Sequence, residues 1–132
     1  MDMNDDELKT MVLDYMDNGY LENIIDMFRH DETLYPLVVD MISDERVRVR
    51  LGATALVEEL VKTDRKPFIR IIPAIAQLLN DANPTLRGDA ANLLGLIRHA
   101  DALPYLLKVQ DDENVFAREI ITDAIHDITG NN

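Results

Sequence analysis

Apolar residues recur along most of the chain three and four positions apart, which is the period of a helix that buries one face. No segment alternates apolar and polar residues in the manner of a half-buried strand. The clearest stripes occupy the third, sixth, seventh and tenth positions after an arginine. They are Ala53, Leu56, Val57 and Leu60, then Ala90, Leu93, Leu94 and Ile97, then Ile121, Ala124, Ile125 and Ile128. The pattern predicts an all-α protein.

Each of these stripes belongs to the second half of a repeated unit. In every copy a Pro stands eight residues before an Asp, and an Arg stands six residues after that Asp. The marks are Pro36, Asp44 and Arg50, then Pro73, Asp81 and Arg87, then Pro104, Asp112 and Arg118. Because Pro is tolerated in the first turn of a helix, each unit is predicted to be a helix, a tight turn and a second helix. The aspartates are 37 and then 31 residues apart, so residues 63–68 are expected to form a longer connection or an added turn.

Residues 1–31 contain two further helical stripes without these marks. Asp17, Asn18 and Gly19 separate the stripes and predict a turn between two helices. A stack of repeats needs an atypical end unit to shield its first core face, and this segment fits that role. We therefore expect one structural domain of about four antiparallel helix pairs. They are 1–31 as an N-terminal capping hairpin, 32–64, 65–100, and 101–132 with the C-terminal cap.

The repeat resembles the HEAT repeat, in the short HEAT-like form of the phycobilisome lyases. The middle unit carries the resemblance with Pro73, Leu78, Leu79, Asp81, Pro84, Leu86, Arg87, Ala90, Ala91, Leu93, Leu94 and Gly95. The first unit keeps Arg50, Ala53 and Leu56, and the last keeps Arg118 and Ala124. The resemblance covers residues 32–130 and implies an α-α superhelix. It also implies a binding scaffold, since only some members of the family have catalytic or cofactor-handling roles.

The repeated Asp and Arg residues are the most regular polar residues of the chain. They are Asp44, Arg50, Asp81, Arg87, Asp112 and Arg118. An Asp in the turn can accept N–H groups at the start of the second helix, and it can pair with the Arg of its own unit or of the next unit. We therefore interpret these residues as a structural ladder rather than as an acid–base site.

Composition argues against most kinds of catalytic site. The 132 residues include no Cys, which excludes disulfides, thiol nucleophiles and zinc–thiolate sites. His30, His99 and His126 stand in separate segments without the spacing of a metal site, and Ser43 is the only Ser, in a turn beside Asp44. The glycines form no phosphate-binding loop. We expect no enzyme activity, no cofactor and no metal site.

The formal net charge of −12 argues against binding to nucleic acid, which requires clustered Lys and Arg. No apolar run approaches the ~18 residues of a membrane span. The acidic N-terminus also lacks the apolar core of a secretory signal. The chain is therefore expected to act in the cytoplasm, away from membranes and nucleic acid, as a monomer or with weak self-association.

These features favour a protein-interaction scaffold that binds a basic or amphipathic partner segment on a concave face made by its second helices. The expected groove consists of Glu58, Glu59, Asp89, Asn92, Leu96, Glu119, Asp123 and Asp127. With Gly88 and Gly95, the central part of this surface would be nearly bare of side chains, which gives a shallow acidic groove with an apolar floor. The other interpretation of Gly95 is that the repeat itself favours a small residue there.

Two alternatives remain open. A basic belt could instead bind an acidic partner, or the acidic end of a second copy, and it consists of Arg46, Arg48, Arg65, Lys66 and Arg70. By analogy with the lyase-type members of the family, the protein could also be an accessory or chaperone-like subunit for an enzyme that attaches a tetrapyrrole cofactor.

Overall fold

The computed structural model describes residues 3–130, and within this range every regular element is a helix, which confirms the predicted all-α class. The chain forms two compact units, the first ending at Leu60 and the second beginning at Val61. The first unit contains α1 (Asp5–Asp17), α2 (Leu21–His30), the 3₁₀ turn η1 (Glu32–Leu34), α3 (Leu37–Ile42) and α4 (Val47–Val61), whose last residue crosses the boundary. The second contains α5 (Lys66–Ile69), α6 (Ile72–Gln77), η2 (Leu78–Asn80), α7 (Pro84–Ile97), η3 (Ala100–Ala102), α8 (Leu103–Lys108) and α9 (Val115–Thr129).

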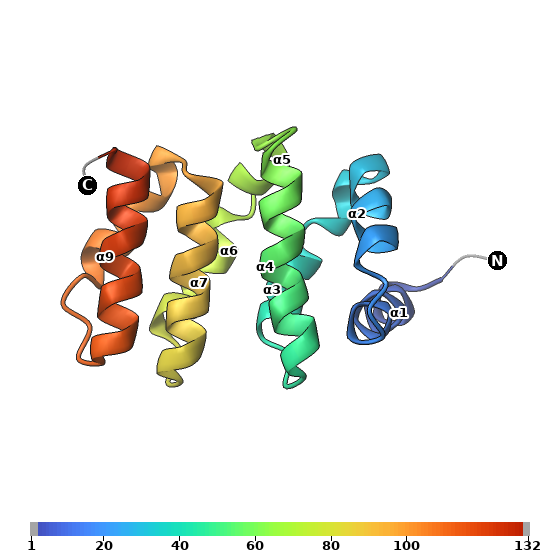
Figure 1. The fold of residues 1–132 in the computed structure, drawn as a ribbon, viewed down its shortest axis with the longest axis horizontal. Helices are drawn as coiled ribbons and strands as arrows, with labels where there is room; N and C mark the ends of the chain where they lie inside the picture. The colour runs from blue at the N-terminus through green and yellow to red at the C-terminus, as the bar shows by residue number, and fades with distance from the viewer. Residues whose placement is uncertain (1–2, 131–132) are drawn as a thin grey trace. The chain divides into compact units, whose positions relative to one another are not determined.

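The first helix pair of the chain is crossed. α1 begins after Asn4, whose side chain accepts the N–H of Glu7 at 2.8 Å, and it ends before Gly19, which has a φ of +87°. A residue without Cβ is the one that tolerates this left-handed backbone, and it lets the chain turn sharply into α2. Figure 1 shows α1 nearly along its axis and α2 from the side. The predicted turn is present, whereas the expectation of an antiparallel hairpin is wrong for this pair.

The second unit consists of two long helices, each with a short partner. Figure 1 shows α7 and α9 side by side and running in the same direction, with α6 and α8 packed behind them. α7 starts at Pro84 behind Asn83, whose side chain accepts the N–H of Thr85 at 2.9 Å. The extra residues between the first two repeats include α5, so the chain makes an added helical turn there.

The apolar stripes of the long helices form the cores. All four stripe residues of α4 and all four of α7 are buried. In α9 the first two are buried, while Ile125 and Ile128 are half-buried. Each fully buried Leu, Ile or Val contributes about 1.5–3 kcal/mol relative to an exposed position, so these stripes supply much of the stability of each unit.

Two glycines of α7 face α9 and are buried. A Cβ added at Gly95 would lie 3.2 Å from the Cα and the Cβ of Ala124 and 3.4 Å from Oδ2 of Asp127. A Cβ added at Gly88 would lie 3.0 Å from Cδ1 of Ile120 and 3.3 Å from Cε1 of Phe116. The two helices therefore approach each other closely, with backbone atoms involved at Gly95 and side-chain ends at Gly88.

The difference between the two glycines predicts opposite effects of a methyl group. Both Gly→Ala changes gain about 1 kcal/mol of helix propensity. At Gly95 the methyl group meets the backbone of α9, and overpacking of this kind costs about 1–3 kcal/mol. We expect Gly95→Ala to lower the free energy of unfolding and Gly88→Ala to leave it equal or higher, as measured by urea unfolding. A more stable Gly95→Ala than Gly88→Ala would contradict this close approach.

Candidate functional site

The turn aspartates of the repeat make the same contact in all three copies. Each carboxylate accepts the backbone N–H of the residue two positions later, at the entrance to the long helix. The oxygen–nitrogen distances are 2.8 Å from Asp44 to Arg46, 2.9 Å from Asp81 to Asn83 and 2.9 Å from Asp112 to Asn114. Because a short carboxylate side chain bonded to nearby backbone favours a turn over a helix, the aspartate fixes where each long helix begins.

The repeat arginines close the same turns from inside the long helix. In each copy Nη1 donates to the carbonyl oxygen of the turn aspartate six residues before it. These distances are 2.8 Å for Arg50 and Asp44, 2.9 Å for Arg87 and Asp81, and 3.1 Å for Arg118 and Asp112. Two of these arginines also donate from Nη1 to a second carbonyl oxygen, Arg50 to that of Glu45 at 2.8 Å and Arg87 to that of Ala82 at 3.2 Å.

Arg87 also links two successive turns. Its Nε donates to Oδ2 of Asp112 at 2.8 Å and its Nη2 to Oδ1 at 2.9 Å, which is a bidentate pair. The Asp112 side chain is 6% exposed and the Arg87 side chain 11% exposed. These hydrogen bonds hold the pKa of the Asp112 carboxyl below its ordinary 3.8 and raise the pKa of Arg87. Arg87 could pair with the Asp of its own repeat or with that of the next repeat. The carboxylate that it binds is that of the next repeat.

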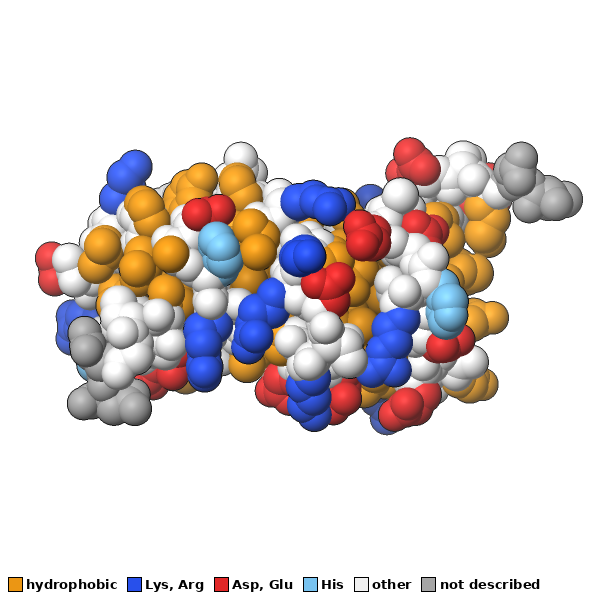
Figure 2. Space-filling model, turned by 90° about the horizontal axis from the view of Figure 1, so that it is seen from above, with side chains coloured by type: hydrophobic (Ala, Val, Ile, Leu, Met, Phe, Trp, Pro, Cys, Tyr) orange, Lys and Arg blue, Asp and Glu red, His pale blue; other side chains and the backbone are white. Residues whose placement is uncertain are grey.

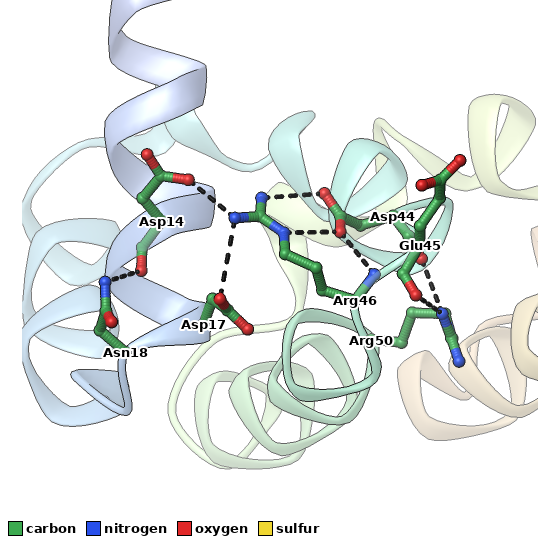
Figure 3. A network of polar contacts seen from close by, with 7 residues as sticks. All are labelled: Asp14, Asp17, Asn18, Asp44, Glu45, Arg46 and Arg50. Atoms are coloured by element: carbon green, nitrogen blue, oxygen red, sulfur yellow. Dashed lines mark hydrogen bonds and ion pairs between the residues drawn. The ribbon is translucent and has the colours of Figure 1, made fainter.

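In the first repeat the corresponding carboxylate, that of Asp44, is bound by an arginine of its own turn. Figure 3 shows Arg46 between α1 and the turn that precedes α4. Its Nε lies 2.9 Å from Oδ1 of Asp44, and its Nη1 lies 2.8 Å from Oδ1 of Asp14 and 3.9 Å from Oδ2 of Asp17. The hydrogen bonds from Arg46 hold the pKa of Asp44 below its ordinary value. We call these four residues the Arg46 cluster, and it ties α1 to α4.

The Arg46 cluster changes the interpretation of the basic belt. Arg46 already lies close to three carboxylates of its own chain. It is therefore not the unpaired cation that the sequence predicted for binding an acidic partner. Arg48, Arg65 and Lys66 are exposed, but Arg48 belongs to the first unit and the other two to the second, as does Arg70. On the face drawn in Figure 2, basic side chains lie among acidic and hydrophobic ones.

The expected groove is likewise divided between the units. Glu58 and Glu59 belong to the first unit, and the other six residues belong to α7 and α9 of the second. Of these six, Asn92, Glu119, Asp123 and Asp127 are exposed, whereas Asp89 and Leu96 are half-buried. The expectation that Gly88 and Gly95 leave the groove open is wrong, because both are buried against α9. Ile120 and Phe116 lie over Gly88, and Ala124 lies over Gly95. For Gly95 the structure fits the other interpretation, a small residue at a helix contact.

Three acidic residues of α9 lie on one side of the helix and make no bond to a cation. Glu119, Asp123 and Asp127 are spaced by four residues, which places them about one helical turn apart. Within residues 3–130, no basic side chain forms an ion pair with any of the three. They contrast with the turn aspartates, whose carboxylates are all engaged. We call them the α9 acidic row.

The sequence did not single out Phe116, the aromatic residue that lies three positions before this row. Phe116 is 56% exposed and Val115 is 57% exposed, although both are apolar. A signal for this exposure was present in the repeat. The position two residues before the repeat arginine, which is Phe116 in the third copy, is Arg48 in the first and Thr85 in the second. A position that is polar in two copies of a repeat is expected to face solvent in the third.

The histidines lie at the surface or at helix ends. His99 accepts the N–H of Asp101 at 3.1 Å and so begins η3, while His30 and His126 are exposed. In the described part of the chain, no three His, Cys, Asp or Glu side chains are placed to hold a metal ion together. No helix among residues 3–130 is long and apolar enough to cross a membrane.

Comparison of the chain with protein-family models, with curated proteins and with solved structures finds no match.

The bidentate pair predicts that Asp112 matters more for stability than its neighbour. Asp112→Ala removes the acceptor of two Arg87 N–H groups and of the Asn114 N–H. We expect the free energy of unfolding to fall by about 1–3 kcal/mol. Asp111 is exposed, so Asp111→Ala is the matched control and should change it by less than about 0.5 kcal/mol. Equal effects of the two variants in urea unfolding would place the Arg87 pair in the class of weak surface ion pairs.

The lowered pKa of Asp112 predicts a pH dependence of known sign. The folded state holds a proton on this carboxyl less tightly than the unfolded chain does. Its contribution to stability is therefore complete above the unfolded pKa of about 4 and is lost as pH falls through the folded pKa. We expect the stability difference between the natural protein and Asp112→Asn to be largest near neutral pH and to shrink below about pH 4. A difference that stays constant down to pH 3 would contradict this assignment.

Proposed function

We propose that the protein is a protein-interaction module that binds a partner segment on the surface of its long helices. The observation that carries the proposal is the α9 acidic row, which is exposed and has no cation partner in the described chain. The carboxylates of the turns, in contrast, are consumed by structural bonds. Charged side chains that the fold does not use internally are available to another molecule.

The proposal includes the finer architecture, a short HEAT-like solenoid of about four helix pairs. Two findings support it within the individual units. The same turn bonds recur in all three marked repeats, and α7 and α9 lie side by side in the same direction with a short helix behind each. Stacked helix pairs present their second helices as a continuous surface, which is the usual binding surface of solenoids.

Charge determines the kind of partner that this surface favours. The protein carries a formal net charge of −12, and the acidic row adds a local negative field on α9. Such a field accelerates encounter with a basic or amphipathic segment and repels anionic surfaces. Binding is expected to weaken as salt is added, because exposed charges are screened over about 8–10 Å at physiological ionic strength.

The test compares two surfaces in proteins that retain the fold. Partners are captured with the natural chain from cell extract, and the affinity of each purified partner is then measured for two triple variants. One is Glu119→Lys, Asp123→Lys and Asp127→Lys, and the other is Arg48→Glu, Arg65→Glu and Lys66→Glu. Arg46 is left unchanged because its replacement would break the Arg46 cluster.

We expect the lysine variant to lose binding by about tenfold or more and the glutamate variant to bind normally. Normal binding by the lysine variant together with loss in the glutamate variant would make the remaining basic residues the working surface. A chain that captures no partner, with bait and extract verified, would refute the interaction function. Circular dichroism of each variant checks that the helices are retained.

A further inference from the structure

Phe116 presents a partly exposed aromatic ring on the surface of the second unit. One edge of its ring rests over Gly88 of α7, where an added Cβ would be 3.3 Å from Cε1 and 3.7 Å from Cδ1. More than half of the residue, 56%, is exposed to solvent. Val115 beside it is 57% exposed. A large apolar side chain that packs against a neighbouring helix and is still largely exposed is the kind of residue that anchors a partner at an interface.

The same face of α9 continues from Phe116 into the acidic row. Successive steps of three, four and four residues lead from Phe116 to Glu119, Asp123 and Asp127, and side chains at such spacing share one helix face. At 1.5 Å per residue, the 11 residues from Phe116 to Asp127 span about 16 Å, or three helical turns. The face is thus apolar at the start of α9 and anionic over the rest of its length.

We propose that this face binds an amphipathic basic helix of a partner protein, with Phe116 as its apolar anchor and the α9 acidic row as its charged contacts. The inference rests on the proposed function and deepens it by naming the anchor and the partner. A complementary helix carries Lys or Arg at intervals of four residues over about two turns, with Leu or Met at the end that covers Phe116. A Lys or Arg next to the ring can add a cation–π contact.

Charge favours such a partner over a second copy of this chain. Each copy has a formal net charge of −12, so two copies repel each other before any contact forms. A basic helix has the opposite charge, so the long-range electrostatic interaction with this chain becomes attractive. It also supplies the cations that Glu119, Asp123 and Asp127 lack within residues 3–130.

The probe is a capped helical peptide of about 16 residues with Lys at three positions spaced by four and a Leu pair at one end. Two matched peptides replace the three Lys by Glu or the Leu pair by Ala. Affinity for the full chain is measured by titration at two salt concentrations. We expect the Lys–Leu peptide to bind, the Glu peptide not to bind, and the Ala peptide to bind about tenfold more weakly or worse.

Variants of the protein test the anchor and the row separately. Phe116→Ala should weaken binding of the Lys–Leu peptide about tenfold, while Leu107→Ala, at a residue 45% exposed on α8, should leave it unchanged. Phe116→Gln is a second variant at the same site should Phe116→Ala lose helix content.

The triple change Glu119→Lys, Asp123→Lys and Asp127→Lys should switch the preference to the Glu peptide. The charge-matched control Glu22→Lys, Glu45→Lys and Asp111→Lys, at exposed positions elsewhere, should not.

Three outcomes would overturn the inference. They are equal effects of Phe116→Ala and Leu107→Ala, no switch of charge preference in the triple variant, and a stable dimer of the natural chain in sedimentation that Phe116→Ala dissociates. The last would make a second copy the occupant. If the peptide fails while a captured partner binds through Arg48, Arg65 and Lys66, this inference is wrong and the interaction function stands.

Discussion

The bidentate bond between Arg87 and Asp112 is the contact on which the geometry of the second unit depends. The guanidinium is bonded to the carbonyls of its own turn and to the carboxylate of the next turn, 25 residues later. The starts of α7 and α9 are therefore held together by directional bonds that tolerate little displacement. Near the other end of the helices, Gly95 lies so close to Ala124 that an added Cβ would be 3.2 Å from its Cα and Cβ. The two helices are fixed at both ends by different physical means.

Aspartate has two different roles in this chain, and the surroundings of each aspartate determine which role it has. The side chain of Asp112 is only 6% exposed, accepts three hydrogen bonds and has a lowered pKa. Asp123, in the helix that follows Asp112, is exposed, and its carboxylate makes no bond in the described chain. A buried carboxylate without partners would be strongly destabilising, so burial and bonding occur together. An exposed one contributes little to the fold and can change without unfolding it. The acidic excess is therefore largely a property of the surface.

The sequence predicted the fold better than it predicted the surface, for physical reasons. The stripes of α4 and α7 depend only on the helical period, and all their residues are buried as expected. The contact of Gly95 with Ala124 depends on how closely α7 and α9 approach each other. The spacing of residues along the sequence does not specify that distance. Arg46 was placed in a basic belt because its neighbours are basic, but its partner Asp14 is 32 residues away. Long-range pairing of this kind is set by the packing of α1, which the repeat pattern does not describe.

The close approach of α7 and α9 has a consequence for the thermodynamics of recognition. Directional bonds at the start of α9 and a close contact near its other end oppose sliding or rotation of the helix when another molecule binds. The surface that α9 presents is therefore preorganised, and association loses conformational entropy mainly in the incoming segment and in a few side chains. Affinity on such a surface responds to individual side-chain contacts, and it depends little on rearrangement of the backbone.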